Sequence, residues 1–469
     1  MSKIVKQRVK YVMTDFVMSF IAFALFNYCR WNVLDLQSTG YSGYVAFFFT
    51  RKMIAEQFIF PLMMLGVYWL SGYYNKPYGK SRLQEFFTTL LSSLLNTLLL
   101  LLILLTNDMV SVIETNYRLL IVLFGCLFSL TYMGRWLITN QSIHAMKNRK
   151  LGFRTLIIGN SNKARQFADK LQNSPTLLGY DVVGFVDIPG ETQSGKKGYR
   201  FDDIEDCITR LGVTQVIISP EDFDDGRIMS LLRRMYDLNV TVKIAPSTFS
   251  YITLGIHLND IYAEPLIELT SPRISESTKN VKRVMDVLFS ALALIVLSPL
   301  YLAVAIAVKL SSPGCVIYKQ ERIGMRQRPF NIYKFRSMRE DAEAGGPALS
   351  SIDDNRVTRV GKFLRKYRLD ELPQFWNVLK GDMSLVGPRP EREFFIRQII
   401  KEAPYYNMLH QIRPGITSWG MVKYGYASTP SEMIDRAQYD LVYLMNMSIL
   451  VDIKIIIYTI KTVFSGEGM

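Results

Sequence analysis

Two adjacent acids near the carboxyl end of the chain are the residues best suited to do chemistry. Asp370 and Glu371 lie in the stretch KYRLDELPQFWNVLKGDMSLVGPRP, which runs from Lys366 to Pro390. One interpretation is structural. Aspartate is a favoured N-cap and proline is tolerated in a first helical turn, so Asp370 would open a helix that runs through Val378. The other interpretation is catalytic, because a carboxylate can act as a covalent nucleophile toward phosphorus.

Basic residues surround the acid pair in the sequence and favour the catalytic interpretation. Arg389 lies in GPRP and Arg413 in RPGIT, and arginines in such stiff Gly/Pro frames suit bidentate recognition of phosphate. Further basic residues are Lys334 and Arg336 in YKFRSM and Arg359, Lys362, Arg365, Lys366 and Arg368 in TRVGKFLRKYR. Because Mg²⁺ prefers a few carboxylates plus phosphate oxygens, Asp370 and Glu371 are also candidate Mg²⁺ ligands. For Arg356 to Arg368, a solvated basic face against anionic lipid stays an open alternative.

Cysteine and histidine usage argues against other kinds of site. The cysteines are scattered without a C-x-x-C pair, and the histidines are far apart without an H-E-x-x-H pattern. A disulfide framework, a zinc site and a histidine-based triad are therefore not expected. The net charge of +14 suits phosphate substrates or anionic lipid, and we find no nucleic-acid-binding signature.

The amino-terminal third of the chain has the composition of a membrane bundle. Apolar runs lie near residues 11–29, 58–74, 86–106 and 119–138, and each can cross roughly 30 Å of hydrocarbon. The basic amino end lacks a small-residue cleavage site, so it predicts a retained first transmembrane helix. Loop charges place both ends of the bundle, residues 1–145, in the cytoplasm. The alternative is that some of these runs are buried core helices.

Residues 146–270 predict a Rossmann-like α/β domain. The β-rich runs TLIIG, VVGFVD, QVIIS and TVKIAP alternate with helical patterns such as 163–171 and 227–238, as in a parallel sheet. After the first strand the text is GNSNKA, with one glycine in place of the dinucleotide-binding fingerprint. A structural or regulatory role is therefore favoured over a nucleotide pocket. A homo-oligomer formed through this domain is a further hypothesis. Residues 270–280 are predicted to be a linker to the next part of the chain.

Residues 271–469 contain a further apolar run, 284–310, interrupted by Ser298-Pro299. Proline removes a backbone donor and breaks or kinks a helix, and the Ser298 hydroxyl could satisfy a freed backbone group. Both flanks of the run are basic, which predicts a re-entrant helix with both ends in the cytoplasm. The alternative is an ordinary kinked span. The carboxyl-terminal apolar segment carries Ser448, Asp452 and Thr459 on one helical face, so it predicts an interfacial or docked helix.

From about Lys279 to Gly466 the chain resembles the bacterial polyprenyl-phosphate hexose-1-phosphate transferases. These are the monotopic phosphoglycosyl transferases, here of the undecaprenyl-phosphate glucose or galactose phosphotransferase type. The resemblance is carried by the Ser-Pro break, YKQERIG, YKFRSM, VTRVGKFLRKYRLDELPQFWNVLKGDMSLVGPRP and RPGIT. The whole chain is similar to the larger members of the family. The resemblance implies a membrane α-helical bundle, an α/β Rossmann-like domain and a mainly α monotopic phosphoglycosyl transferase domain with a re-entrant membrane helix.

The resemblance also implies a reaction. Asp370 would attack the β-phosphate of a UDP-hexose and release UMP, with Glu371 as its partner and Mg²⁺ at the pair. Undecaprenyl phosphate would then attack the phosphosugar-aspartyl intermediate, in the first membrane step of exopolysaccharide, capsule or O-antigen synthesis. The re-entrant break at Ser298-Pro299 would keep the site on the cytoplasmic face of the bacterial inner membrane, in contact with the lipid bilayer. The residues that match phosphate-holding positions are Lys334, Arg336, Arg365 and Arg389.

Some residues depart from the family pattern. Where the family often reads RPGITGWAQV, this chain reads RPGITSWGMV, with Ser418, Gly420 and Met421, and Gln327 stands where glycine is common. These differences affect expected nucleotide and sugar contacts and leave the acid pair intact. Two rival functions are a membrane-anchored sugar-nucleotide dehydratase or epimerase and a non-catalytic scaffold of polysaccharide assembly. The first needs a glycine fingerprint and usually Tyr-x-x-x-Lys, which are missing. The second is disfavoured by the intact acid pair.

Overall fold

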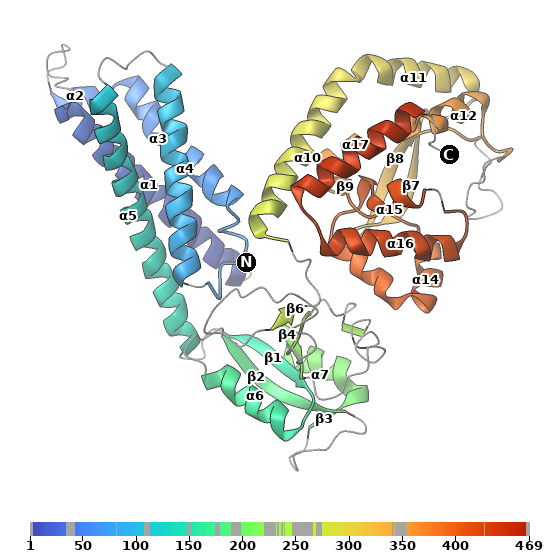
Figure 1. Ribbon diagram of the computed structural model, residues 1–469, viewed down its shortest axis with the longest axis horizontal. Coiled ribbons are helices and arrows are strands. Elements are labelled where there is room, and N and C mark those ends of the chain that lie inside the picture. Colours follow the sequence, from blue (N-terminus) through green and yellow to red (C-terminus); the bar gives the residue numbers. More distant parts are fainter. Residues whose placement is uncertain are drawn as a thin grey trace.

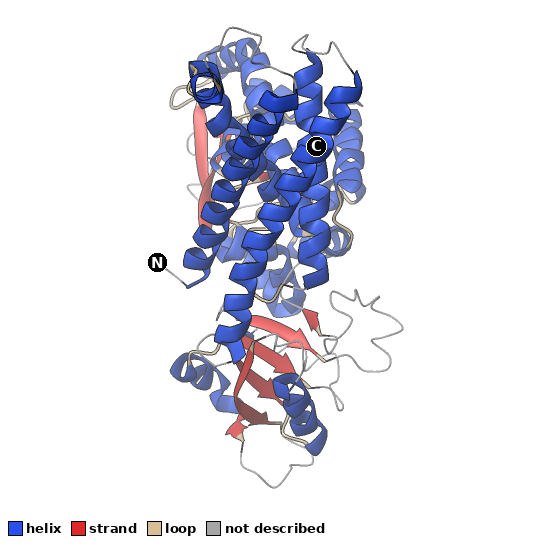
Figure 2. Ribbon diagram, turned by 90° about the vertical axis from the view of Figure 1, so that its left-hand side faces the viewer, coloured by secondary structure: helices blue, strands red, loops and turns tan. Residues whose placement is uncertain are grey.

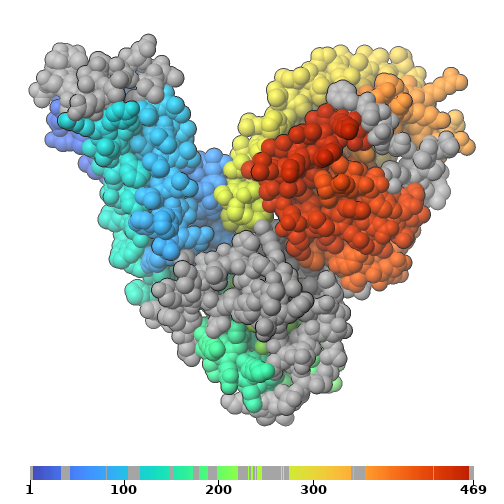
Figure 3. Space-filling model, in the orientation of Figure 1, coloured from blue at the N-terminus to red at the C-terminus, as the bar shows by residue number. Residues whose placement is uncertain are grey.

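The computed structural model shows three groups of elements, which are a helical bundle, an α/β sheet and a mainly helical carboxyl-terminal part (Figure 1). In the space-filling view the bundle and the carboxyl-terminal part form two arms that meet near residues 276–280 (Figure 3). The residues that the structure describes are 3–33, 43–80, 82–106, 113–147, 152–173, 179–188, 198–219, 231, 234–235, 238, 240–245, 266–268, 274–339, 342, 354–425 and 427–465.

Four long apolar helices form the bundle, as expected. They are α1 (Lys3–Val33), α3 (Arg51–Leu70), α4 (Arg82–Thr106) and α5 (Ile113–Lys147), accompanied by the short α2 (Tyr44–Phe48). Each of the four is long and apolar enough to cross a membrane. They lie side by side in two perpendicular views (Figures 1 and 2). This chain is therefore built as a membrane protein.

A cluster of charged and hydroxyl groups lies buried inside the bundle. The Arg135 guanidinium contacts the Asp15 carboxylate at 2.7 Å, and both side chains are completely buried. Arg135 Nη1 also donates to Thr89 Oγ1, and the Tyr74 hydroxyl donates to Asp15. A charge buried in hydrocarbon is costly unless it is paired, and these hydrogen bonds satisfy the pair. The cluster thus ties α1, α4 and α5 to the segment that follows α3.

The middle elements form a six-stranded sheet in the order β3-β2-β1-β4-β5-β6 (Figure 2). All pairs are parallel except β5 with β6, as expected for a Rossmann-like domain. Strand β4 is buried at all four positions, which is typical of a parallel strand covered on both faces. The elements are β1 (Phe153–Ile158), α6 (Asn162–Asn173), β2 (Tyr180–Asp187), β3 (Tyr199–Arg200), α7 (Ile204–Leu211), β4 (Gln215–Ile218), β5 (Thr241–Ile244) and β6 (Ile267–Glu268). Most of the expected helix 227–238 lies outside the described residues.

The carboxyl-terminal part is mainly helical, with two small sheets. Strands β7 and β8 are antiparallel, and β9 and β10 are parallel. The elements are α10 (Glu276–Val296), α11 (Ser298–Ser311), β7 (Ile317–Ile323), η3 (Met325–Gln327), β8 (Pro329–Phe335), α12 (Arg359–Lys366), η4 (Leu369–Glu371), α13 (Gln374–Lys380), β9 (Ser384–Val386), α14 (Glu393–Glu402), η5 (Pro404–Gln411), β10 (Gly415–Thr417), α15 (Trp419–Lys423), α16 (Pro430–Met445) and α17 (Ile449–Ser465).

The expected apolar run is a pair of helices bent by 63° between α10 and α11. Pro299 lies at the start of α11, where a missing backbone donor is tolerated. The N-cap of α11 is Leu297, which forms no side-chain cap hydrogen bond. The predicted linker also ends earlier than expected. Ser275 caps α10 by accepting from the Thr278 amide, so residues 276–280 are helical.

The first turn of α10 packs on the bundle. Asn75 Nδ2 donates to Glu276 Oε2 at 2.9 Å, and Asn280 Nδ2 donates to the Trp69 carbonyl at 2.5 Å. Gly72 has φ 79° and a Cβ added there would lie 2.6 Å from Glu276 Cβ, so only glycine fits this approach. The segment that leaves α3 is thereby fixed to the first helix of the carboxyl-terminal part.

The carboxyl-terminal helix α17 is docked on its own domain, as expected. Asp452 accepts from Lys282 Nζ at 2.5 Å and from the Tyr443 hydroxyl at 2.6 Å. Thr459 exchanges a hydrogen bond with Thr417 at the end of β10. The polar face noted in the sequence is therefore the face that binds the domain.

Candidate active site

Asp370 and Glu371 lie in the short 3-10 turn η4 and do not open a helix. The structural interpretation of Asp370 as the N-cap of a helix through Val378 is therefore wrong. Helix α13 begins after Pro373, whose ring nitrogen cannot donate, and the preceding bonds are of the i to i+3 type, such as Glu371 N to Arg368 O. Arg368 itself has φ 52°, a left-handed conformation that turns the chain into η4.

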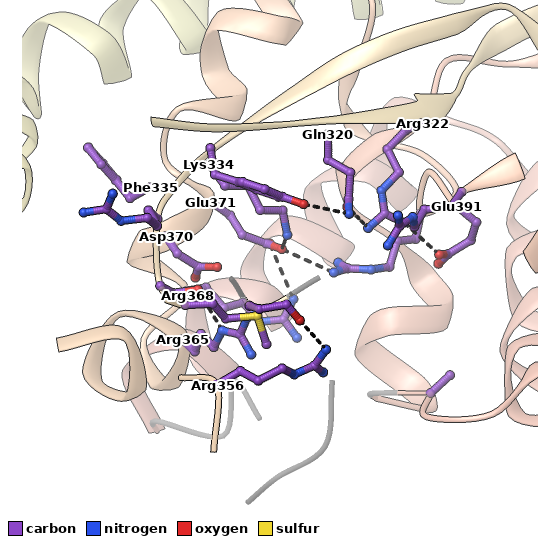
Figure 4. A pocket seen from close by; sticks show the side chains of 18 of the residues that line it. Gln320, Arg322, Lys334, Phe335, Arg356, Arg365, Arg368, Asp370, Glu371 and Glu391 are labelled. Atoms are coloured by element: carbon purple, nitrogen blue, oxygen red, sulfur yellow. Dashed lines mark hydrogen bonds and ion pairs between the residues drawn. The ribbon is translucent and has the colours of Figure 1, made fainter. Parts of the chain in front are cut away.

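Three basic side chains bind the Glu371 carboxylate. Lys334 Nζ lies 2.7 Å from Glu371 Oε1, Arg389 Nη2 lies 3.3 Å from the same oxygen, and Arg368 Nη1 lies 3.9 Å from Oε2 (Figure 4). Burial by itself would raise the pKa of Glu371, but these three cations outweigh burial and hold its pKa well below the ordinary value. Glu371 is thus a carboxylate that three cations hold in its ionised form.

Asp370 is buried beside Glu371 but is bonded differently. It is 7% exposed, and among the described residues none donates a hydrogen bond to its carboxylate or forms an ion pair with it. Burial raises the pKa of Asp370, opposed by Lys334 and assisted by the charge of Glu371. A poorly solvated carboxylate with a raised pKa is a stronger nucleophile than an ordinary surface aspartate. The pair therefore consists of one anchored acid and one reactive acid.

Both acids line a cavity of about 330 Å³ whose walls are strongly basic. Of the lining residues that the structure describes, ten are Lys or Arg and three are acids. Four of the expected phosphate-binding residues belong to this wall, namely Lys334, Arg336, Arg365 and Arg389. An excess of cations around two carboxylates suits a ligand that carries several negative charges.

Several guanidinium groups in the wall keep unused donors. Arg336 donates to the Ser312 carbonyl and Arg365 donates to Ser337 Oγ. Yet among the described residues the buried Nε and Nη1 of Arg336, Nη1 of Arg365 and Nε of Arg368 have no acceptor. A buried N–H without an acceptor is costly, so these donors point to an anionic ligand.

Helix α12 divides the basic run that precedes the acids. Arg365 reaches the cavity, whereas Arg359, Lys362 and Lys366 are exposed. The run 356–368 is therefore partly a ligand wall and partly a solvated basic face.

Arg413 is the exception among the expected binding residues, and that expectation is corrected. Its Nε donates at 2.9 Å to the carbonyl of Gly381, the left-handed residue that ends α13. It lines a second cavity with Arg283 and His410, away from the acid pair. Cations commonly satisfy the free carbonyls at a helix end, so Arg413 supports the helix that follows the acids.

Comparison with known proteins places this site in a family. Residues 277–466 match the family of bacterial sugar transferases. The chain is 33% identical over 317 residues to the UDP-glucose:undecaprenyl-phosphate glucose-1-phosphate transferase of Escherichia coli, covering 66% of this chain and 68% of that protein. The chain belongs to the bacterial sugar transferase family. The resemblance expected from the sequence is thereby confirmed.

Other relatives of this sugar transferase match different lengths of it. The UDP-N-acetylgalactosamine-undecaprenyl-phosphate N-acetylgalactosaminephosphotransferase of Aeromonas hydrophila is 47% identical over 188 residues, which cover 40% of this chain and 44% of that protein. The UDP-glucose:undecaprenyl-phosphate glucose-1-phosphate transferase of Klebsiella pneumoniae is 30% identical over 342 residues, covering 71% and 73%. The chain thus spans less than half of the Aeromonas relative and about two thirds or more of the other two.

The middle of this transferase matches a CoA-binding domain family over residues 70–246. The described residues do not fit a nucleotide in the usual Rossmann position, where an acid at the end of the second strand receives the ribose. That acid, Asp187, already accepts from Asn160 Nδ2 at 2.6 Å and from the Gly198 amide at 3.1 Å. Gly159 is the only glycine of the fingerprint. The preference for a structural or regulatory role is retained.

Sequence reasoning missed a second ionic group in the site of this transferase. Glu391 pairs with Arg322 at 3.1 Å and with Arg436 at 2.7 Å, and all three line the cavity (Figure 4 labels Glu391 and Arg322). These ion pairs connect β7, which carries Arg322, to α16, which carries Arg436, through Glu391, two residues after Arg389. The signal available was Arg322 in YKQERIG and Glu391 directly after GPRP, but their pairing depends on elements that lie far apart in the chain.

The carboxylates of this transferase show whether a Mg²⁺ ion would fit the site. Glu371 is engaged by three cations, whereas the Asp370 carboxylate faces the cavity without a partner among the described residues. No group of three or more His, Cys, Asp or Glu side chains forms a protein-only metal site in the described part of the chain. Mg²⁺ commonly takes one or two carboxylates and completes its shell with substrate phosphates and water. The arrangement fits that mode, with Asp370 as the available carboxylate.

Proposed function

We propose that this protein transfers a hexose 1-phosphate from a UDP-sugar to undecaprenyl phosphate and releases UMP. This would be the first membrane step in the synthesis of an exopolysaccharide, capsule or O-antigen. The observation that carries the proposal is the buried Asp370 carboxylate, which has no partner among the described residues and lies in a cavity that ten described basic residues line. The relatives from Escherichia coli and Klebsiella pneumoniae are named for UDP-glucose, and the Aeromonas relative for UDP-N-acetylgalactosamine.

The first step forms a covalent phosphosugar-aspartyl intermediate. An Asp370 oxygen forms a bond to the β-phosphorus of the donor, and the bond from that phosphorus to the bridging oxygen breaks. The bridging oxygen leaves with the electron pair as part of UMP. In the second step a phosphate oxygen of undecaprenyl phosphate attacks the same phosphorus, and Asp370 leaves as a carboxylate. A covalent intermediate divides one difficult displacement into two easier ones.

The other residues hold charge and geometry. Lys334, Arg389 and Arg368 keep Glu371 ionised and fixed, so η4 presents Asp370 in one orientation. The unused donors of Arg336 and Arg365 would bind donor phosphate oxygens. Mg²⁺, held by Asp370 with Glu371 beside it, would neutralise charge on the diphosphate and the leaving UMP.

The bend between α10 and α11 supports a re-entrant insertion. A helix pair bent by 63° can enter the membrane and return, which leaves both flanks on one side. The exposed apolar side chains of the pair, including Leu292, Ile295 and Leu302, would face lipid. The site would then lie on the cytoplasmic face of the bacterial inner membrane, where nucleotide sugars are available and the lipid phosphate can reach Asp370. The predicted homo-oligomer remains to be tested by mass measurement in detergent.

The decisive experiment follows UMP release by membranes that contain the protein. They are given Mg²⁺, undecaprenyl phosphate and a panel of UDP-hexoses, beside an Asp370→Asn variant. We expect UMP with the wild type and none with the variant. Without the lipid acceptor, mass spectrometry should find a hexose phosphate on the peptide that carries Asp370. Release of UDP would show glycosyl transfer, and equal activity of the variant would contradict the role of Asp370.

A further inference from the structure

A second cavity lies where the sheet, the start of α10 and the carboxyl-terminal part meet. Its volume is about 630 Å³, compared with about 330 Å³ for the cavity at Asp370. The sheet contributes Thr241 from β5 and Glu268 from β6. The lining residues on α10 lie in the first half of that helix, at the end remote from the bend with α11 (Figure 1). Neither acid of the catalytic pair lines this cavity, which is large enough for a small-molecule ligand.

Basic side chains outnumber acids in the lining of the second cavity. Of the lining residues that the structure describes, six are Lys or Arg and three are acids. Two of the cations are paired, Lys279 with an acid on its own helix and Lys282 with Asp452. The remaining cations form no ion pair within the described part of the chain, and they are Arg283, Arg326, Arg328 and Arg413. An excess of unpaired guanidinium groups around one cavity attracts an anion.

Arg283 and Arg413 lie close together at the carboxyl end of α13. Arg283 donates to the carbonyls of Val378 and Leu379, and Arg413 Nε donates to the carbonyl of Gly381. That contact is the only hydrogen bond that Arg413 makes with the described residues, so its two Nη groups have no acceptor among them. Burial lowers the pKa of Arg413, and the charge of Arg283 lowers it further. A bound anion would offset this repulsion.

The tip of the hairpin between β7 and β8 brings the other two arginines to the cavity. Arg326 and Gln327 have φ 58° and 57°, and the Arg328 amide donates to the Met325 carbonyl across them. Turns with positive φ at both central residues favour glycine and asparagine, because other side chains are strained there. Strained backbone is concentrated at functional sites. Arg326 and Arg328 are both exposed, so an arriving ligand can reach them.

His410 adds an uncharged polar group to the same lining. It is 7% exposed, and its buried Nδ1 has no hydrogen-bond partner among the described residues. Burial lowers the pKa of His410 to about 4, so the ring is neutral at pH 7. A buried nitrogen without a partner is costly, and in the tautomer protonated at Nδ1 it can donate to a phosphate oxygen.

We infer that the second cavity binds a soluble small molecule that carries at least two phosphate groups. The four unpaired guanidinium groups offer more donors than a single phosphate needs. The position of the cavity, at the end of α10 remote from the bend, favours a dissolved ligand over a lipid headgroup. Because Arg283 and Arg413 also hold the end of α13, which follows the acid pair, a bound ligand would act on the catalytic elements from outside their cavity.

The test follows hydrogen exchange of the full chain in phosphatidylcholine nanodiscs, with and without inorganic pyrophosphate. Mass spectrometry reports protection separately for the segments 325–328 and 408–414 and for the segment that contains the acid pair. Binding in the second cavity is therefore distinguished from binding in the catalytic cavity. The measurement needs no turnover, so its result does not depend on the function proposed above.

Two double variants make the test specific. Arg326→Gly with Arg328→Gln removes two cations and relieves the strained turn, so its melting temperature should stay equal or rise. Arg359→Gln with Lys362→Gln is the matched control, since both residues are exposed on α12 and line neither cavity. We expect pyrophosphate to protect segments 325–328 and 408–414 in the wild type and in the control. Its affinity should fall about tenfold or more in the hairpin variant.

The other outcomes would overturn the inference. Equal protection in the two double variants would contradict a site at the hairpin tip, as would protection confined to the acid pair or no protection at all. Nanodiscs that contain phosphatidylglycerol test the source of the phosphate. If that lipid alone protects both segments and pyrophosphate adds nothing, the ligand is a lipid headgroup and the assignment to a soluble molecule is wrong.

Discussion

Lys334 Nζ lies 2.7 Å from Glu371 Oε1, and this buried contact gives two adjacent carboxylates opposite properties. Burial lowers the pKa of Lys334, yet Glu371 opposes that effect and the ion pair is retained. The pKa of Glu371 is held down, whereas the pKa of its neighbour Asp370 is raised by burial. The surroundings of the two carboxyl groups thus shift their pKa values in opposite directions, and this suits Glu371 to hold position and Asp370 to react.

Replacing Asp370 should separate activity from stability. The folded-state pKa of Asp370 is raised, so its charged form costs stability once the pH exceeds that pKa. Asp370→Asn removes this cost while abolishing the nucleophile. We expect UMP release to fall by at least about a thousandfold and the melting temperature at pH 7 to stay equal or rise. Loss of both properties together would mean that Asp370 is chiefly structural.

Removing Lys334 should damage both properties. Lys334→Met leaves the buried Glu371 carboxylate with weaker compensation, and breaking a buried ion pair costs about 3–5 kcal/mol. Thermal unfolding in detergent and UMP release should both decline, the latter about tenfold or more. Lys319→Met is the matched control, since Lys319 is exposed on the paired strand β7. Its effect on stability should stay within about 0.5 kcal/mol.

The pH dependence should report the Asp370 carboxyl. The reactive form is ionised, so activity falls as the pH drops through its folded-state pKa, which is raised above the ordinary value of about 3.9. The cleanest measurement is the UMP burst without lipid acceptor, because the acceptor phosphate then does not titrate in the assay. An acid limb at or below the ordinary aspartate value would contradict the burial of a free carboxylate.

The stability that the buried Asp15–Arg135 ion pair gives to the bundle should depend on the geometry of the pair as well as on its charge. Arg135→Met leaves Asp15 charged and unpaired, at an expected cost of about 3–5 kcal/mol. Arg135→Lys should restore only part of this, because the guanidinium binds both Asp15 oxygens and Thr89 at once. Thermal unfolding in detergent measures both variants, with the exposed Arg118→Met as control. Full rescue by lysine would show that charge alone matters.

The elements that depend on local pattern could be predicted from the sequence. The four apolar helices, the strands β1, β2, β4 and β5 and the break at Ser298-Pro299 all follow from composition and period. Gln327, noted as a departure from glycine, has φ 57°, which explains why glycine is common at that position. The antiparallel β6 was missed because two residues carry no periodic signal.

The features that depend on tertiary contacts could not be predicted. Nothing local distinguishes Arg413, which binds a helix end, from Arg389, which reaches the acid pair, since both lie in Gly/Pro frames. The N-cap expectation for Asp370 failed because the left-handed Arg368 and Pro373 divide the segment into two turns. The pairing of Asp15 with Arg135 joins residues 120 positions apart and is invisible to a hydropathy profile.

The contact of Gly72 and Asn75 with the first turn of α10 connects two segments that lie about 200 residues apart in the chain. The covalent path from α3 to α10 passes through α4, α5 and the whole Rossmann-like domain, whereas the hydrogen bond between Asn75 and Glu276 connects the two segments directly. A displacement of α10 would therefore act on the bundle through this contact. The sheet contributes no residue to it. Residues 152–268 could be exchanged for another module without removing either partner of this contact. The membrane bundle and the catalytic elements would still constrain each other.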